Sequence, residues 1–212
     1  NDMPGEIAGE EIESVEGEII KVVSISGNGL FQDNILTLPQ MTDEYRTLFL
    51  MDSDSRLLRK YALRGTFRIN NIGESGHNGI RIIFRYTNDS NYYCVMFNKA
   101  GEVSILRMFN GQWLELSDDI PPVRNFPLRV EEDFNFEVLT DPGNVSVRIN
   151  GREILKGPIT LGTDQSGGVY VSNSEVVLTN LEFVIPDGYE EQEIKIPEYN
   201  NPGNTLINLE NA

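Results

Sequence analysis

Apolar and polar residues alternate with a period of two along most of the chain, and short turn signals separate the alternating runs. Residues 79–116 contain four such runs, rich in β-branched and aromatic residues and divided by clusters of Asn, Asp, Gly and Ser. Branched and aromatic side chains pack well on a pleated sheet, and the turn residues tolerate positive φ. The pattern therefore predicts an antiparallel meander of four strands.

Further strands are predicted on both sides of the meander, and no segment has a convincing helical period. Asn150-Gly151 is the strongest two-residue hairpin signal in the chain. Many short strands at short spacing are typical of an all-β, antiparallel sandwich. The additional strands are expected at residues 17–26, 31–38, 48–51, 64–70, 133–139, 144–149, 152–155, 168–172 and 176–185.

The turns of the meander predict which side chains share a face of the sheet, because each pairing fixes the register. A symmetrical first turn would pair Arg85 with Tyr93 and Tyr86 with Tyr92. A turn centred on Ala100 would set Tyr93 opposite Arg107, Val95 opposite Ile105 and Phe97 opposite Val103, and a two-residue turn at Asn110-Gly111 would set Met108 opposite Trp113.

Two rows of candidate binding residues follow from this register. One row holds Arg85 and Arg107 beside Tyr93, and the other is aromatic. An aromatic ring stacks on the apolar face of a sugar, and a guanidinium group donates to its hydroxyls, so these residue types suit carbohydrate binding. The same rings would also serve as a cross-strand ladder that only stabilises the sheet. The candidate carbohydrate-binding residues are Arg85, Tyr86, Tyr92, Arg107 and Trp113.

The net charge of -16 is concentrated at the two ends of the chain. Residues 1–18 carry seven acids and no base, and residues 186–212 carry six acids and one Lys. Acidic segments with few apolar residues bury too little surface to offset the entropy of ordering. We therefore predict an acidic N-terminal tail over 1–14, a sandwich domain over 15–186 and an acidic C-terminal tail or linker over 187–212.

Composition also excludes several classes of partner. Basic residues are dispersed and the pI is about 4.4, which disfavours nucleic acid and anionic membrane surfaces. No apolar run approaches the roughly 18 residues that membrane insertion requires. Cys94 stands alone, so no internal disulfide is expected and we interpret it as a small buried hydrophobe. His77 lacks a second His and is interpreted as a solvated loop residue.

The order of these parts resembles the concanavalin A-like lectin and laminin G-like jelly rolls. The resemblance covers about residues 15–186 and implies an antiparallel jelly-roll β-sandwich. It further implies a carbohydrate-binding module, an adhesion domain or, in a minority of the superfamily, a glycosidase. It is carried by Phe84-Arg85, Asn91-Tyr92-Tyr93, Phe134-Asn135-Phe136-Glu137, Asn150-Gly151, Gly167-Gly168-Val169 and the closing segment 177–184.

Catalysis is not expected, because the acidic run 131–137 lacks the carboxylate spacing of glycosidases that resemble laminarinases. The resemblance adds a structural calcium ion, with Asp52 and Asp54 as candidate ligands and Asp118-Asp119 as a second acidic cluster. No other cofactor is expected.

The sequence thus predicts a non-catalytic carbohydrate-binding module of an extracellular or cell-surface, bacterial, multidomain protein. Its expected partners are a polysaccharide or glycan and the neighbouring domains of a longer chain. The alternative is a structural or adhesion domain that docks protein partners. A third hypothesis is a glycoside hydrolase with unrecognised carboxylates.

Overall fold

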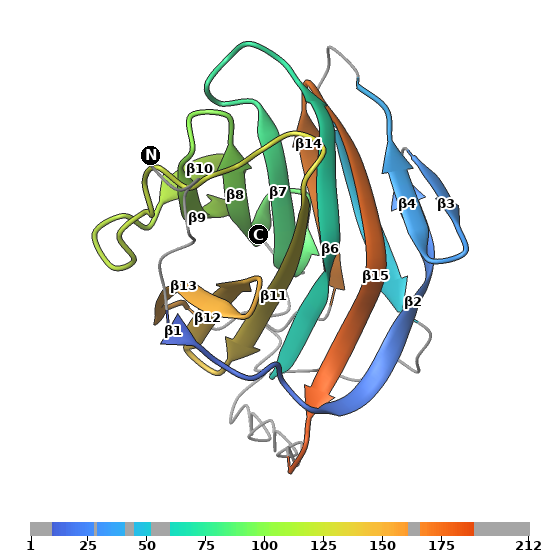
Figure 1. Ribbon diagram of the computed structural model, residues 1–212. Coiled ribbons are helices and arrows are strands. Elements are labelled where there is room, and N and C mark those ends of the chain that lie inside the picture. Colours follow the sequence, from blue (N-terminus) through green and yellow to red (C-terminus); the bar gives the residue numbers. More distant parts are fainter. Residues whose placement is uncertain (1–9, 28, 41–44, 52–59, 161–165, 189–212) are drawn as a thin grey trace, which may run out of the picture.

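Two antiparallel sheets stack face to face and enclose an apolar core, with sheet A toward the viewer and sheet B behind it in Figure 1. The computed structural model describes residues 10–27, 29–40, 45–51, 60–160 and 166–188, and these contain strands but no helix. The predicted fold class, an all-β antiparallel jelly-roll sandwich, is confirmed. Among the described residues no helix is long and apolar enough to cross a membrane.

Sheet A begins at the short strand β1 and runs toward β15. Its spatial order is β1 (Glu10–Glu11), β13 (Arg152–Pro158), β12 (Asn144–Ile149), β11 (Asp133–Asp141), β6 (Tyr61–Ile72) and β15 (Ser174–Pro186). The far edge of β15 is shared by β2 (Gly17–Gly27) and β4 (Ile35–Leu38), and β3 (Leu30–Gln32) pairs with β4.

Sheet B starts from the same strand β2, whose pairing changes from β15 to β5 between Lys21 and Val22, next to a bulge between Val22 and Ser24. A bulge bends the strand and increases its twist, which allows one strand to belong to both sheets. Sheet B continues through β5 (Tyr45–Met51), β14 (Ser166–Ser172), β7 (Gly79–Asn88), β8 (Asn91–Asn98), β9 (Val103–Phe109) and β10 (Gln112–Glu115).

The inner faces of the sheets form one apolar core. Phe67 of sheet A lies near its middle, with its ring centroid 5.0 Å from that of Phe97 and 5.3 Å from that of Phe134. Burial of each such side chain contributes about 1.5–3 kcal/mol. Because alternate residues point inward, the remaining positions of each strand are available on the two outer faces.

Two predicted hairpin turns are confirmed, and one was missed. Asn110-Gly111 and Asn150-Gly151 both have positive φ at each residue, as a type I′ turn requires. The predicted single strand over 31–38 is wrong, because Asp33 and Asn34 also take positive φ, 52° and 59°, and divide it into β3 and β4. Asp and Asn enter the left-handed region more readily than other side chains.

The register of the meander is partly as predicted. Tyr93 faces Arg107 and Met108 faces Trp113, so the β8–β9 and β9–β10 pairings are confirmed. The predicted pairing of Arg85 with Tyr93 is wrong: Phe84 takes that place.

The cause is a bulge in β7. The next paired residues after Phe84 and Tyr93 are Asn88 and Asn91, so Arg85, Tyr86 and Thr87 oppose Tyr92 alone. The predicted one-to-one pairing of Tyr86 with Tyr92 is therefore also wrong.

Part of the predicted N-terminal tail contacts the sandwich. Glu10 and Glu11 form β1 and pair with Glu153 and Arg152, and Ile12 N donates to the Gly151 carbonyl. Residues 1–9 and 189–212 lie outside the described part of the chain.

Candidate functional site

A row of charged side chains crosses the outer face of sheet A. Arg148 of β12 faces Glu137 of β11, Glu137 faces Arg64 of β6, and Arg64 faces Glu182 of β15. Basic and acidic groups therefore alternate across four neighbouring strands. Their neighbours along each strand point into the core, which fixes these four on the outside.

The row consists of two ion pairs of well-defined geometry. Arg148 Nη1 donates to Glu137 Oε1 at 2.5 Å, and these two side chains are only 11% and 6% exposed. Arg64 donates from Nε and Nη2 to Glu182 Oε2, each at 2.9 Å. Charge-assisted bonds of this length hold the planar groups in fixed orientations.

The segment 13–15 lies along the row and is fixed to it by main-chain hydrogen bonds. Arg148 Nη1 donates to the Glu13 carbonyl at 2.8 Å, and Val15 N donates to Glu137 Oε2 at 3.0 Å. Arg64 Nη1 donates to the Val15 carbonyl at 3.2 Å. This segment therefore forms a wall beside the charged row.

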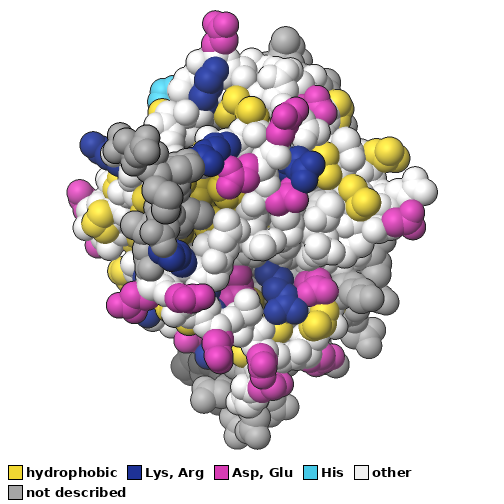
Figure 2. Space-filling view, in the orientation of Figure 1, with side chains coloured by type: hydrophobic (Ala, Val, Ile, Leu, Met, Phe, Trp, Pro, Cys, Tyr) yellow, Lys and Arg dark blue, Asp and Glu magenta, His cyan; other side chains and the backbone are white. Residues whose placement is uncertain are grey.

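An open groove of about 270 Å³ lies over this row. Figure 2 shows basic and acidic side chains side by side on this face, above and below an area of uncharged groups. The two arginines and two glutamates of the lining sum to zero charge. The lining residues are Ser14, Arg64, Gly65, Thr66, Asn135, Phe136, Glu137, Arg148, Gly151, Asn180 and Glu182.

The uncharged lining residues retain hydrogen-bonding capacity. Thr66 Oγ1 donates to Asn135 Oδ1 at 2.8 Å, which leaves the Nδ2 donor of Asn135 available. Asn180 is exposed, has φ 54° next to the bulge in β15, and its amide has no partner among the described residues. The groove thus offers amide, hydroxyl, guanidinium and carboxylate groups together.

Three of the residues predicted from sequence, Tyr86, Tyr92 and Trp113, lie together on the outer face of sheet B. The ring centroids of Tyr86 and Tyr92 are 5.9 Å apart, and those of Tyr92 and Trp113 are 5.7 Å apart in an edge-to-face arrangement. Tyr92 is buried, whereas Trp113 is 40% exposed. Trp113 is therefore the ring of this group with the largest contact surface for a ligand.

The two predicted arginines do not join this aromatic group. Arg85 is only 2% exposed, and its guanidinium lies 5.6 Å from the ring centre of Tyr61. Its backbone, at φ 50°, donates from N to the Tyr61 hydroxyl at 2.9 Å. The bulge in β7 therefore turns Arg85 into the protein, and its assignment as a solvent-facing sugar ligand is corrected.

Arg107 lies beside Tyr93, on the same face of sheet B, as predicted. Its guanidinium lies 5.3 Å from the ring centre of Tyr93 and 4.4 Å from that of Phe109. A small cavity of about 240 Å³ between Arg85 and Arg107 is lined also by Thr87, Asn91, Tyr92, Tyr93, Met108 and Thr160.

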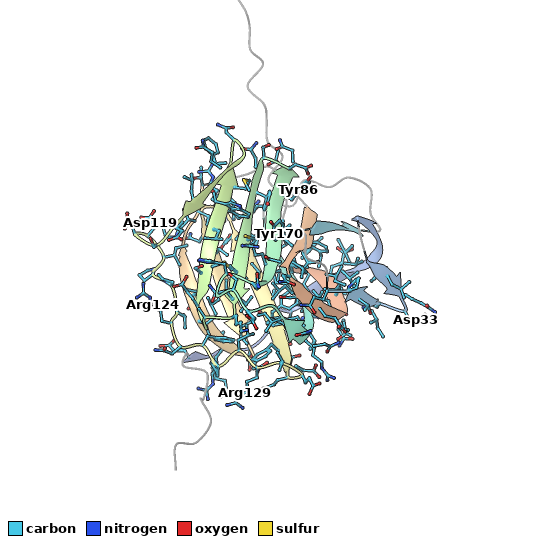
Figure 3. The ribbon with its side chains drawn as sticks, turned by 90° about the horizontal axis from the view of Figure 1, so that it is seen from above. Asp33, Tyr86, Asp119, Arg124, Arg129 and Tyr170 are labelled. Carbon is cyan, nitrogen blue, oxygen red and sulfur yellow. The ribbon has the colours of Figure 1, made fainter. Side chains whose placement is uncertain are left out.

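Two residues that contact Trp113, namely Arg81 and Tyr170, were not predicted from the sequence. The guanidinium of Arg81 lies 5.5 Å from the Trp113 ring centre and 4.6 Å from that of Tyr170, and the two rings are 6.2 Å apart. Tyr86 and Tyr170 belong to neighbouring strands and are labelled in Figure 3. Tyr170 reaches this face from β14, which pairs with β7, and no local sequence signal connects those strands.

The groove on sheet A was missed for the same reason. Its charged residues are at positions 64, 137, 148 and 182, far apart in the sequence. Each of them alone is typical of a solvent-facing position in an alternating strand.

The candidate calcium ligands Asp52 and Asp54 lie outside the described residues. Within the described ranges, no three acidic, His or Cys side chains are grouped as a metal site would need. His77 is exposed in its loop, as expected. Cys94 is fully buried, and desolvation raises the pKa of its thiol to about 12 despite the opposing charge of Arg81, so it is a buried hydrophobe as predicted.

Comparisons with known proteins identify the fold but no family. No family model matches the sequence, and no curated protein matches it. Among solved structures, the carbohydrate-binding module CBM66 from Bacillus subtilis aligns over 76% of this chain and 95% of its own, with a TM-score of 0.58 and 14% identity.

Two further structures have the same architecture. The exoplasmic/lumenal domain of VIP36 in its Ca²⁺/Man-bound form aligns over 79% of this chain and 84% of its own, with a TM-score of 0.57 and 12% identity. A Bacillus subtilis protein of unknown function with a galectin-like fold aligns over 76% and 88%, with a TM-score of 0.50 and 12% identity. The chain therefore has a lectin-like jelly-roll fold, as the resemblance implied.

Proposed function

We propose that this protein is a non-catalytic carbohydrate-binding domain that holds a neutral saccharide in the groove on sheet A. The observation that carries the proposal is the balanced row across the groove, in which Arg64 and Glu182 are partly exposed and the largely buried pair of Arg148 and Glu137 lies beside them. Solved structures of carbohydrate-binding and lectin domains with this fold support it.

The chemistry of the groove suits sugar hydroxyls. Each hydroxyl both donates and accepts, and the groove alternates guanidinium and amide donors with carboxylate acceptors. Because the charges of the lining cancel, an isolated phosphate or cation gains little there compared with a neutral polyhydroxyl ligand. The ion pairs orient these groups before the ligand arrives, which reduces the entropy lost on binding.

The same ion pairs argue against the hydrolase hypothesis. Glycosidases require one carboxyl group that donates a proton to the leaving oxygen. Glu137 and Glu182 are both engaged as acceptors of guanidinium hydrogen bonds, and Glu137 also accepts from Val15 N. In this arrangement neither glutamate is placed as a proton donor.

Protein docking is the second candidate function, and the β3–β4 hairpin favours it. The hairpin projects from the body of the sandwich, with Asp33 at its tip in Figure 3. Leu30 and Ile35 on this hairpin are exposed apolar residues. A structural or adhesion role would use this surface and leave the groove unoccupied.

We place the domain at the cell surface or outside the cell, as part of a longer bacterial protein. This proposal is supported by the acidic composition of residues 1–18 and 186–212 and by the likeness in fold to a carbohydrate-binding module from Bacillus subtilis. A polysaccharide or glycan is the expected partner.

Glycan-array screening followed by calorimetry tests the proposal. We expect a neutral oligosaccharide to bind, and Asn180→Gly combined with Glu182→Gln to weaken it at least tenfold. Asn180→Gly removes the amide but keeps the positive φ at no steric cost.

Asn125→Gly is the matched control, since Asn125 is also exposed and has φ 59° but lies outside the groove. Equal affinity in the wild type and the groove variant would disprove the site. Absence of binding across a broad array would favour the docking function.

A further inference from the structure

A second polar row crosses the outer face of sheet B, on the opposite side of the sandwich from the groove. Tyr170, Arg81, Met96 and Ser104 face one another in order across β14, β7, β8 and β9. Met96 belongs to a buried apolar cluster on this face, together with Ile83, Tyr92, Cys94 and Leu106. The two polar groups Arg81 and Ser104 thus stand in an otherwise apolar and aromatic surface.

Arg81 has no carboxylate partner. It forms no hydrogen bond or ion pair with any described residue, and its Nε is shielded from water without an acceptor. Its guanidinium is held instead by stacking on Trp113 and Tyr170. In contrast, five other described arginines, at positions 64, 68, 124, 129 and 148, each pair with a carboxylate.

Ser104 is the second unpartnered group of the row. The residue is 8% exposed, and its Oγ has no hydrogen-bond partner. A buried polar atom without a partner is costly, and such atoms are uncommon in native structures. Arg81 Nε and Ser104 Oγ are both enclosed, so a ligand on this face meets Arg81 through the remaining nitrogens of its guanidinium, which is only partly buried.

Trp113 provides the remaining part of a binding surface. It is 40% exposed on β10, and its ring is nearly perpendicular to the neighbouring rings of Tyr92 and Tyr170. Its indole N–H has no partner among the described residues and is available to a ligand. An exposed ring beside an unpaired guanidinium is suited to a sugar ring that carries a negative charge.

We propose that this outer face of sheet B is a binding site for an anionic saccharide. The carboxylate or sulfate group accepts hydrogen bonds from the guanidinium of Arg81, and the sugar ring stacks on the exposed ring of Trp113. Glu115 lies on the same face, two residues beyond Trp113, and opposes the anion. The site is separate from the groove on sheet A and differs from it in ligand charge.

Trp113 is the one Trp of the sequence, so tryptophan fluorescence, excited at a wavelength that the eight tyrosines do not absorb, reports on this site alone. The full chain is titrated with a hexuronic acid trimer, with the same trimer fully methyl-esterified, and with a sulfated oligosaccharide. We expect the acid to change Trp113 fluorescence and to bind at least tenfold more tightly than its neutral ester. The sulfated ligand shows whether sulfate serves as well as carboxylate. Higher salt should weaken the binding of both anions.

Variants locate the site. Arg81→Gln should weaken binding of the acid at least tenfold, and Glu115→Gln should strengthen it about threefold. The groove variant, Asn180→Gly with Glu182→Gln, should leave binding of the acid unchanged. The proposal for the groove on sheet A and the proposal for the outer face of sheet B can therefore be disproved independently of each other. If Arg81→Gln does not fold by circular dichroism, the acid-to-ester comparison and Glu115→Gln decide.

Equal affinity for acid and ester, or wild-type affinity in folded Arg81→Gln, would overturn the proposal. Loss of acid binding in the groove variant would do the same. A short polyglutamate peptide that binds as tightly as the uronate would show that the ligand is a protein segment and not a saccharide.

Discussion

The ion pair of Glu137 and Arg148 allows a quantitative test of how the groove is held together. Both side chains are largely buried, at 6% and 11% exposure. Removal of one partner leaves a charge with little access to water, which typically costs about 3–5 kcal/mol. We therefore expect Glu137→Leu and Arg148→Met each to destabilise the fold by about this amount.

The double variant should be far less damaged, because neither charge remains. Replacement of a buried pair by apolar residues of similar size is often neutral or stabilising. Here the Val15 N–H and the Glu13 carbonyl also lose their partners, which adds about 1–2 kcal/mol. The expected coupling energy from the double-mutant cycle is therefore at least about 2 kcal/mol.

Urea denaturation followed by circular dichroism measures these differences. Arg68 and Asp133 provide a control pair between β6 and β11, with Arg Nε to Oδ1 at 2.7 Å and side chains 45% and 55% exposed. Their removal should change stability little, because exposed pairs are well screened. Additive losses below about 1 kcal/mol for Glu137 and Arg148 would refute the reasoning.

Three further predictions concern other parts of the sandwich. Tyr61→Phe removes the acceptor of the buried Arg85 N–H and should destabilise the fold by about 1–3 kcal/mol, measured by urea denaturation; an unchanged midpoint would contradict the role of this bond. The hydrogen bond from Arg68 lowers the pKa of Asp133, so its stabilising contribution is present above about pH 4 and is lost as the pH falls through the lowered value. In an NMR titration Arg68→Gln should return this pKa to its ordinary range, and an unchanged titration would count against the pairing. Cys94, with its thiol pKa raised to about 12, should resist thiol reagents at pH 8 until the protein unfolds; modification of the native protein would disprove its burial.

The local parts of the fold were predictable from sequence. Period-two alternation located most strands, and the turns around Ala100 and at Asn110-Gly111 fixed the register of β8 with β9 and of β9 with β10. The bulge at Arg85 was not predictable in this way. It depends on a hydrogen bond to Tyr61, which lies 24 residues earlier and on the opposite sheet.

The candidate sites depend on strand order, which alternation does not encode. Arg64 meets Glu137 and Glu182 only because β6 lies between β11 and β15. The guanidinium of Arg81 contacts the ring of Trp113 on the outer face of sheet B, and no pattern in the sequence around either residue predicts this contact. Tyr86, Tyr92 and Trp113 could therefore be predicted as one surface from the sequence. The guanidinium group of Arg81 beside them could not.

The main-chain contacts of segment 13–15 have a practical consequence for recombinant work. A fragment that starts at residue 15, where we had predicted the domain boundary, would lack the Glu13 carbonyl and the Ser14 side chain. Arg148 would then lose one acceptor, and the groove would open toward solvent at that end. Binding measurements made on such a shortened fragment would underestimate the affinity of the intact chain.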